Sequence, residues 1–123
     1  MNLVDSSVWL EYFADSPNAE FFAATIEDTE NLIVSTINIY EVYKRILQQR
    51  GEDAALQAVA LMHQAGVVEV TSSIAMDAVK LSTEFKLPMA DSLILATART
   101  FGATLWTQDA DFQGIPDVKF TKK

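Results

Sequence analysis

Short apolar segments alternate with longer amphipathic segments along this chain, and this alternation constrains the fold more than any other feature. The apolar segments have the length of strands and span residues 2–5, 31–35, 67–71 and 103–107, with a short edge strand expected at 118–121. The amphipathic segments predict helices at residues 6–14, 19–28, 37–50, 52–65, 74–86 and 89–101. Apolar strands separated by helices form parallel sheets with both faces covered. The sequence therefore predicts an α/β fold with a mostly parallel central sheet of four to five strands, flanked by helices.

Local signals predict where the helices begin and end. Hydroxyl side chains precede three helices and are the expected N-caps: Ser6 or Ser7, Thr36, and Ser72 or Ser73. A glycine follows three helices and is expected to end them: Gly51, Gly66 and Gly102. Residues 108–112 are expected to form a loop or a single turn.

The composition limits the domain count and the chemistry. With 123 residues, half of them hydrophobic, the chain is expected to form one domain over residues 1–123. The absence of cysteine excludes disulfides, thiolate metal sites and thiol nucleophiles, and it suits the reducing cytoplasm. No apolar run reaches about 18 residues, so we expect neither a signal peptide nor contact with a membrane.

The charge is strongly acidic and unevenly distributed. The formal net charge is −8, and no lysine or arginine precedes Lys44. This balance argues against tight, charge-driven binding to bare nucleic acid. It fits a protein that binds metal or meets a basic partner, and the simpler alternative for most of the acids is a solvated surface.

Four acids are expected at one edge of the sheet. Asp5 ends the first strand, Asp109 follows the strand 103–107, Glu41 lies in the second turn of a helix, and Asp91 lies near the start of another. Helices that follow parallel strands begin at the carboxyl edge, where ligands bind in such folds. Each acid also has a purely structural explanation, because Asp5 could cap a helix, Glu41 could pair with Arg45, Asp91 could complement a helix dipole and Asp109 could stabilise a turn.

Four carboxylates that meet in one place require a counter-charge, because like charges raise one another's pKa values. Mg²⁺ and Mn²⁺ prefer oxygen ligands, and the chain has no cysteine or histidine cluster that would suit zinc. The one histidine, His63, lies in a predicted helix and is expected to be a surface or core-edge residue. An all-oxygen metal site is typical of enzymes that hydrolyse phosphodiester bonds with water as the nucleophile.

Three motifs resemble the PIN domain, and most closely its VapC-type toxin ribonucleases. They are "LVDSSVWLEYF", "NIYEVYKRI" and "LPMADSLILATARTFGATLWTQDADF". The resemblance implies a PIN-like three-layer sandwich, and it implies that four residues are catalytic and bind Mg²⁺ or Mn²⁺: Asp5, Glu41, Asp91 and Asp109. Thr107 and Ser7 would orient the site by hydrogen bonding. Asp111 would be a further, outer metal ligand, or alternatively a turn cap before Phe112.

The resemblance also implies an activity and partners. It implies a metal-dependent endoribonuclease, the toxin of a toxin–antitoxin pair, held inactive by a cognate antitoxin protein and forming a homodimer. Hydrolysis by water would leave a 5′-phosphate and a 3′-hydroxyl. Four basic residues are candidates for RNA contact, although each could also be an ordinary exposed charge: Lys44, Arg45, Lys86 and Arg99. The aromatic residues of two helices are expected to pack in the core or against a partner rather than stack on bases: Trp9, Tyr12, Phe13, Tyr40 and Tyr43.

Three other interpretations fit the sequence less well. A receiver domain requires paired acids after the first strand and a late lysine, but Ser6 follows Asp5 and no lysine lies between Pro88 and Asp117. A phosphatase of the haloacid-dehalogenase type requires a second aspartate where Ser7 stands. A non-catalytic PIN-like scaffold that binds RNA or protein is the remaining alternative, and it gives no reason for a chain to keep four mutually repelling acids.

Overall fold

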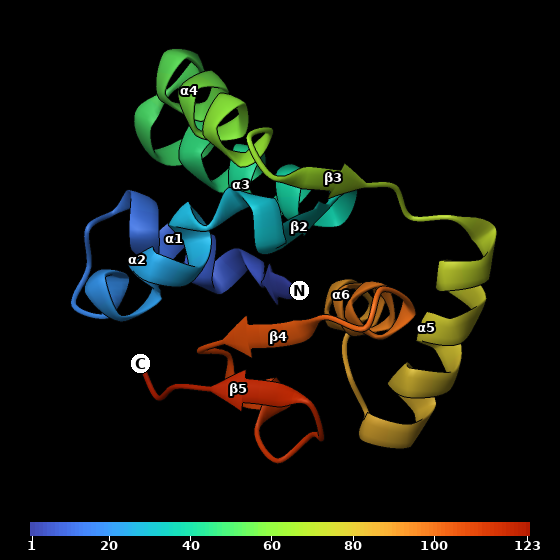
Figure 1. The fold of residues 1–123 in the computed structure, drawn as a ribbon. Coiled ribbons are helices and arrows are strands. Elements are labelled where there is room, and N and C mark those ends of the chain that lie inside the picture. The colour runs from blue at the N-terminus through green and yellow to red at the C-terminus, as the bar shows by residue number, and fades with distance from the viewer.

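Five parallel strands form one central sheet in the computed structural model of the protein, which describes residues 1–123 (Figure 1). The strands are β1 (Asn2–Val4), β2 (Leu32–Ser35), β3 (Gly66–Val68), β4 (Thr104–Thr107) and β5 (Val118–Phe120). Their order across the sheet is β3-β2-β1-β4-β5, and every neighbouring pair is parallel. The predicted α/β fold is confirmed, including the short edge strand near the C-terminus.

Six helices flank the sheet. They are α1 (Ser6–Phe13), α2 (Ala19–Glu27), α3 (Thr36–Arg50), α4 (Glu52–Met62), α5 (Ser72–Phe85) and α6 (Met89–Thr100), with short 3₁₀ turns η1 (Thr29–Asn31) and η2 (Ala110–Phe112). Figure 1 shows α1 to α4 gathered together and α5 lying beside α6 in another part of the molecule. No helix is both long enough and apolar enough to cross a membrane.

Neighbouring residues of the central strands contribute to two separate cores. Val4 and Val34 pack in a cluster with residues of α1 to α4, whereas Leu3 and Ile33 pack in a second cluster with residues of α6 and η2. Successive side chains of a strand point to opposite faces of the sheet, so each cluster covers one face. This arrangement is the three-layer sandwich, and it explains why the strand segments are apolar at almost every position.

Three predicted N-caps are wrong by one residue. Asp5 caps α1, Ser35 caps α3 and Thr71 caps α5, instead of Ser6 or Ser7, Thr36, and Ser72 or Ser73. In each case the preceding residue has the extended backbone that a cap requires, and the predicted residue is already inside the helix. The structural alternative given for Asp5, that it caps a helix, is thereby confirmed. The shift matters for the site, because it makes the carboxylate of Asp5 part of a helix terminus.

The third strand is shorter than predicted and begins earlier. It spans Gly66–Val68 rather than residues 67–71, so Gly66 starts a strand instead of ending a helix, and α4 already ends at Met62. The cause is tertiary pairing, because β3 contacts only β2, and the register ends where Ser35 lies opposite Val68. Beyond Ser35 the chain enters α3, which leaves residues after Val68 without a strand partner.

Candidate active site

The carboxyl edge of the sheet brings distant segments of the chain together. β1 and β4 are neighbours with Val4 opposite Trp106, so Asp5 and Thr107 both lie where these strands end. The four predicted acids all line one open pocket of about 560 Å³: Asp5, Glu41, Asp91 and Asp109. The structure therefore places the whole predicted acidic set around one pocket, from the N-cap of α1, from α3, from α6 and from the loop after β4.

Asp5 accepts more hydrogen bonds than the other acids of the pocket. One carboxylate oxygen accepts hydrogen bonds from the backbone N–H of Ser7 at 2.7 Å, from the Ser7 hydroxyl at 2.5 Å and from the backbone N–H of Val8 at 3.3 Å. The other oxygen accepts a bond from the Thr107 hydroxyl at 2.6 Å. Burial raises the pKa of Asp5, and these hydrogen bonds oppose the rise because they stabilise the ionised form.

Thr107 links Asp5 to the next acid along the chain. Its hydroxyl donates to Asp5 and accepts a bond from the backbone N–H of Asp109 at 2.9 Å. Thr107 is fully buried, so it acts on the acids and not directly on a bound molecule. Ser7 likewise donates to Asp5. The two residues predicted to orient the site are thus both hydrogen-bonded to the same carboxylate.

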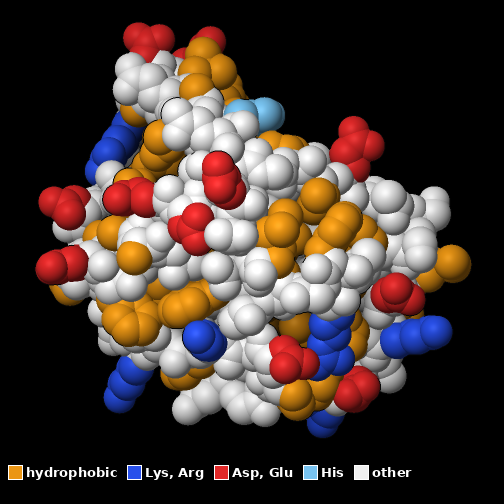
Figure 2. All heavy atoms as spheres, in the orientation of Figure 1, with side chains coloured by type: hydrophobic (Ala, Val, Ile, Leu, Met, Phe, Trp, Pro, Cys, Tyr) orange, Lys and Arg blue, Asp and Glu red, His pale blue; other side chains and the backbone are white.

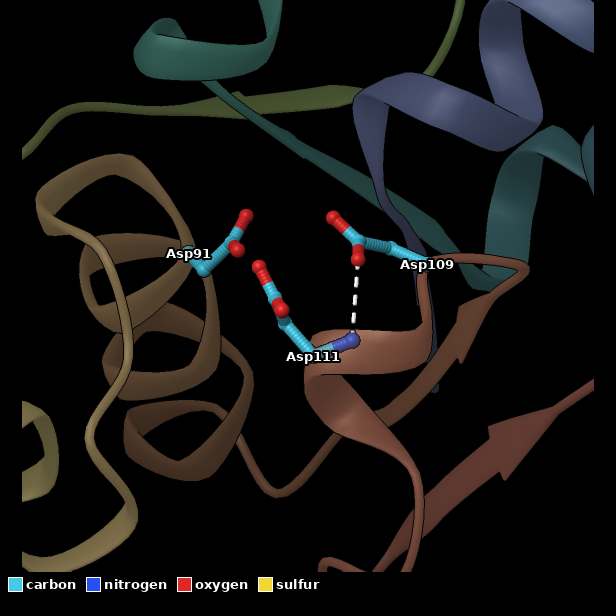
Figure 3. A group of neighbouring side chains, drawn as sticks. All are labelled: Asp91, Asp109 and Asp111. Carbon is cyan, nitrogen blue, oxygen red and sulfur yellow. Dashed lines mark hydrogen bonds between the residues drawn. The ribbon is translucent and has the colours of Figure 1, made fainter.

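Three carboxylates form a tight group, and two of them, Asp91 and Asp109, line this pocket. Figure 3 shows Asp91 from α6 pointing toward Asp109 and Asp111, which come from the segment that contains η2. One carboxylate oxygen of each residue lies within 4.8 Å of the others. The backbone N–H of Asp111 donates to Asp109 at 2.9 Å, which fixes the turn. Asp111 is exposed, and its carboxylate completes a set of three oxygen donors.

The pKa of Asp91 is raised to about 7. Partial burial is the largest cause, followed by the negative charges of Asp109, Asp5 and Asp111 and by side-chain hydrogen bonding with Asp111. Burial and like charge both disfavour the ionised form of a carboxyl group. A cation placed among these groups would relieve the repulsion, so the electrostatics fit the binding of a positively charged ligand.

Glu41 lies on the α3 side of the pocket and is held by a separate network. One of its carboxylate oxygens accepts a bond from the Ser6 hydroxyl at 2.6 Å, and the Ser6 oxygen accepts a bond from the Asn38 amide at 3.1 Å. Asn38 in turn accepts a bond from the backbone N–H of Ser35, which caps α3. The hydrogen bond of Glu41 therefore runs to α1, and not to Arg45 on its own helix as the structural alternative suggested.

The donor set fits a hard divalent cation. All its donors are carboxylate oxygens, which Mg²⁺ and Mn²⁺ prefer, and those of Asp91, Asp109 and Asp111 lie within 4.8 Å of one another. Asp5 and Glu41 line the pocket outside this tight group, where they could act through an intervening water or a second ion. His63 is exposed at the end of α4 and does not line the pocket.

Two of the four candidate basic residues lie at the pocket. Lys44 and Arg45 line it, because they follow Glu41 on α3. Lys86 is instead the C-cap of α5, and Arg99 packs over the Phe85 ring with its guanidinium carbon 5.5 Å from the ring centroid. Arg99 is eight residues after Asp91, a helical rise of about 12 Å that carries it away from the carboxyl edge.

Of the five aromatic residues considered above, four belong to the core and one lies at the pocket. Trp9 is in the core, and Tyr12, Phe13 and Tyr43 pack against it, as predicted. Tyr40 is 60% exposed and lines the pocket, so it does not pack in the core. Its position on α3 directly before Glu41 places it at the rim.

A buried polar network next to the site was not predicted. Glu11 and Gln108 are almost fully buried, and the Gln108 amide donates to Glu11 at 2.9 Å. The other Glu11 oxygen accepts a bond from the backbone N–H of Asn18 at 2.7 Å, and the Asn18 amide donates to Gln108 at 3.0 Å. Gln108 stands between Thr107 and Asp109, so the network anchors the segment that carries both. The one sequence signal was an acid within the apolar helix of residues 6–14.

The fold and the acidic pocket define a class of protein, and the family comparison agrees with it. A family model described as the PIN domain matches residues 3–118. The chain belongs to the PIN domain family. No curated protein matches the sequence significantly.

Solved structures with the same fold include toxins of toxin–antitoxin systems. A toxin–antitoxin complex from Klebsiella pneumoniae aligns with a TM-score of 0.84 at 25% identity and covers 100% of both chains. The sarcin–ricin loop cleaving toxin VapC20 of Mycobacterium tuberculosis aligns with a TM-score of 0.74 at 19% identity over 92% of each chain. A DNA-bound VapBC from Salmonella typhimurium aligns with a TM-score of 0.77 at 16% identity, covering 99% of this chain and 98% of that chain.

Proposed function

We propose that this protein is a metal-dependent endoribonuclease and the toxin of a toxin–antitoxin pair. The observation that carries the proposal is the group of Asp91, Asp109 and Asp111, whose carboxylate oxygens lie within 4.8 Å of one another beside the pocket that Asp5 and Glu41 also line. Membership of the PIN family and the likeness to the Klebsiella pneumoniae toxin–antitoxin complex support the toxin assignment. The Mycobacterium tuberculosis relative that cleaves the sarcin–ricin loop supports RNA as the substrate.

Asp91, Asp109 and Asp111 would hold Mg²⁺ or Mn²⁺, with Asp5 and Glu41 completing the site. When bound, the ion would supply a Lewis acid and positive charge for phosphodiester hydrolysis. Asp5 would keep a fixed geometry through Ser7 and Thr107.

Water would be the nucleophile, because metal-assisted hydrolysis of a phosphodiester needs no nucleophile from the protein. The Ser6 hydroxyl donates to Glu41 and the Ser7 hydroxyl donates to Asp5. The chain has no cysteine. Attack by water, and not by the ribose 2′-hydroxyl, would leave a 5′-phosphate and a 3′-hydroxyl at the cleaved bond. Lys44 and Arg45 at the pocket would contact the negatively charged backbone of the substrate.

We further propose that a cognate antitoxin protein inhibits the toxin, that the toxin forms a homodimer and that it works in the cytoplasm. The solved relatives support an antitoxin partner, since several are toxin–antitoxin complexes. Measuring the mass of the purified chain in solution would test the dimer.

Incubation of purified protein with end-labelled single-stranded RNA, in Mn²⁺ or in chelator, tests the activity. Cleavage in Mn²⁺ alone, with 5′-phosphate products, is expected for the wild type and not for Asp91→Asn. That variant removes one negative charge with little change of shape. Binding of RNA without cleavage, whether or not metal is added, would instead favour the non-catalytic scaffold.

A further inference from the structure

A second pocket lies next to the acidic one. It encloses about 620 Å³ between α1, the segment before α2 and the second half of α3. It shares three lining residues with the acidic pocket: Ser7, Leu10 and Arg45. The two pockets are therefore adjacent, and a chain molecule that occupies the first would reach the second by passing Arg45.

The two pockets carry opposite charge. Four acids and two basic residues line the first, whereas Glu11 is the only acid among the residues that line the second. The basic residues of the second pocket are Arg45, Arg50 and Lys123. The protein has only nine lysines and arginines and a net charge of −8, so this grouping differs from the overall balance. On the face seen in Figure 2, acidic side chains predominate over the upper part, and most basic side chains lie in the lower part with further acids among them.

The one acid of the second pocket is buried, and its oxygens already have hydrogen-bond partners. Both oxygens of Glu11 accept hydrogen bonds, one from the Gln108 amide and one from the backbone N–H of Asn18. Glu11 is 5% exposed, whereas Arg45 and Arg50 are exposed and free to move toward a ligand. An anion in this pocket would thus meet guanidinium groups before it meets the carboxylate.

We infer that the second pocket binds phosphates of the RNA strand next to the scissile bond, through Arg45 and Arg50. This inference rests on the proposed nuclease function and adds the path of the substrate. Arginine is the residue best suited to bind phosphate, because its planar guanidinium donates two parallel hydrogen bonds. Arg45 and Arg50 are separated by a helical rise of about 7.5 Å along α3, so they meet different phosphates of one strand.

Binding of a fluorescent single-stranded oligoribonucleotide tests this path without relying on cleavage. The Asp91→Asn protein is compared with the same protein carrying Arg50→Gln, at salt concentrations from 50 to 300 mM. Each phosphate contact on a single strand contributes about 0.7 to the slope of log K against log salt. Loss of one contact is therefore expected to lower that slope by about 0.7 and to weaken binding roughly fivefold at 0.1 M salt.

Two variants make the result specific. Arg50→Lys keeps the charge and is expected to restore the salt slope, whereas Arg99→Gln alters an arginine that lines neither pocket and is expected to change nothing. In the cleaving enzyme, Arg50→Gln is expected to raise KM for a long RNA with kcat unchanged. Unfolding temperatures of all variants establish that each one is folded.

Equal salt slopes and affinities for Arg50→Gln and Arg99→Gln would overturn the inference. A second outcome would also overturn it: an oligo-glutamate peptide binds through Arg50, but RNA binding does not depend on Arg50. The pocket would then be a protein-binding surface. Failure of the wild type to cleave RNA, together with RNA binding that depends on Arg50, would refute the nuclease function and leave this path intact.

Discussion

Replacing Asp91 with asparagine should stabilise the metal-free protein, and the gain should grow with pH. Burial and three neighbouring carboxylates raise the pKa of Asp91 from 3.8 to about 7 in the folded protein. Between these two values the folded state keeps a proton that the unfolded state has lost. The contribution of Asp91 to the free energy of unfolding therefore falls as pH rises toward 7 and is least favourable above that pH.

The size of the effect follows from the shift. Over the roughly two pH units from pH 5 to pH 7, the folded state holds about one proton more than the unfolded state. This lowers the free energy of unfolding by roughly 2.7 kcal/mol. Asp91 is only partly buried, and solvent screening should reduce this to about 1.4 kcal/mol. For a chain of this size, that difference shifts the unfolding temperature by roughly 6 °C.

Thermal unfolding in chelator at pH 5 and pH 8 measures this difference. The unfolding temperature of Asp91→Asn minus that of the wild type should be about 6 °C larger at pH 8 than at pH 5. Asp77→Asn, at an exposed position on α5, is the matched control and should follow the wild type at both values. If Asp91→Asn and the wild type show the same dependence on pH, the carboxylates do not repel one another as argued, and the electrostatic reasoning fails.

The metal site and the hydrogen bonds around it should respond to three further perturbations. In thermal unfolding, Mn²⁺ at about 100 times its dissociation constant should stabilise the wild type by about 2.7 kcal/mol and Asp91→Asn far less. Equal stabilisation of both proteins would mean that the ion binds elsewhere. Thr107→Val leaves a buried oxygen of Asp5 without its donor, so denaturant unfolding should show a loss of about 1–3 kcal/mol together with slower RNA cleavage; full activity would contradict the positioning role. Glu11→Gln places an amide against a network of N–H donors and should cost a similar 1–3 kcal/mol, and unchanged stability would mean that the network does not anchor the segment around Gln108.

The sheet and its acidic edge were predictable because they depend on local patterns and on one general rule. Apolar segments of strand length separated by helices specify a parallel sheet, and the carboxyl ends of parallel strands lie at one edge. The rule on carboxyl ends predicts that four acids lie together, and they line one pocket: Asp5, Glu41, Asp91 and Asp109. Their roles as metal ligands are still predictions.

Features that depend on tertiary contacts were not predictable in the same way. The end of β3 is set by the end of its partner β2, which the sequence of residues 66–71 does not reveal. The bond between Glu11 and Gln108 joins residues 97 positions apart, and no local pattern signals it. The exclusion of Lys86 and Arg99 from the pocket depends on where α5 and α6 end relative to the sheet.

Crystals of the protein soaked in Mn²⁺ and measured for anomalous scattering test the central claim most directly. The account predicts a manganese peak about 2 Å from carboxylate oxygens of Asp91 and Asp109. It predicts no peak at that position in crystals of Asp91→Asn. A fully soaked wild-type crystal with no manganese between these residues, or with manganese bound only elsewhere on the acidic surface, would contradict the account.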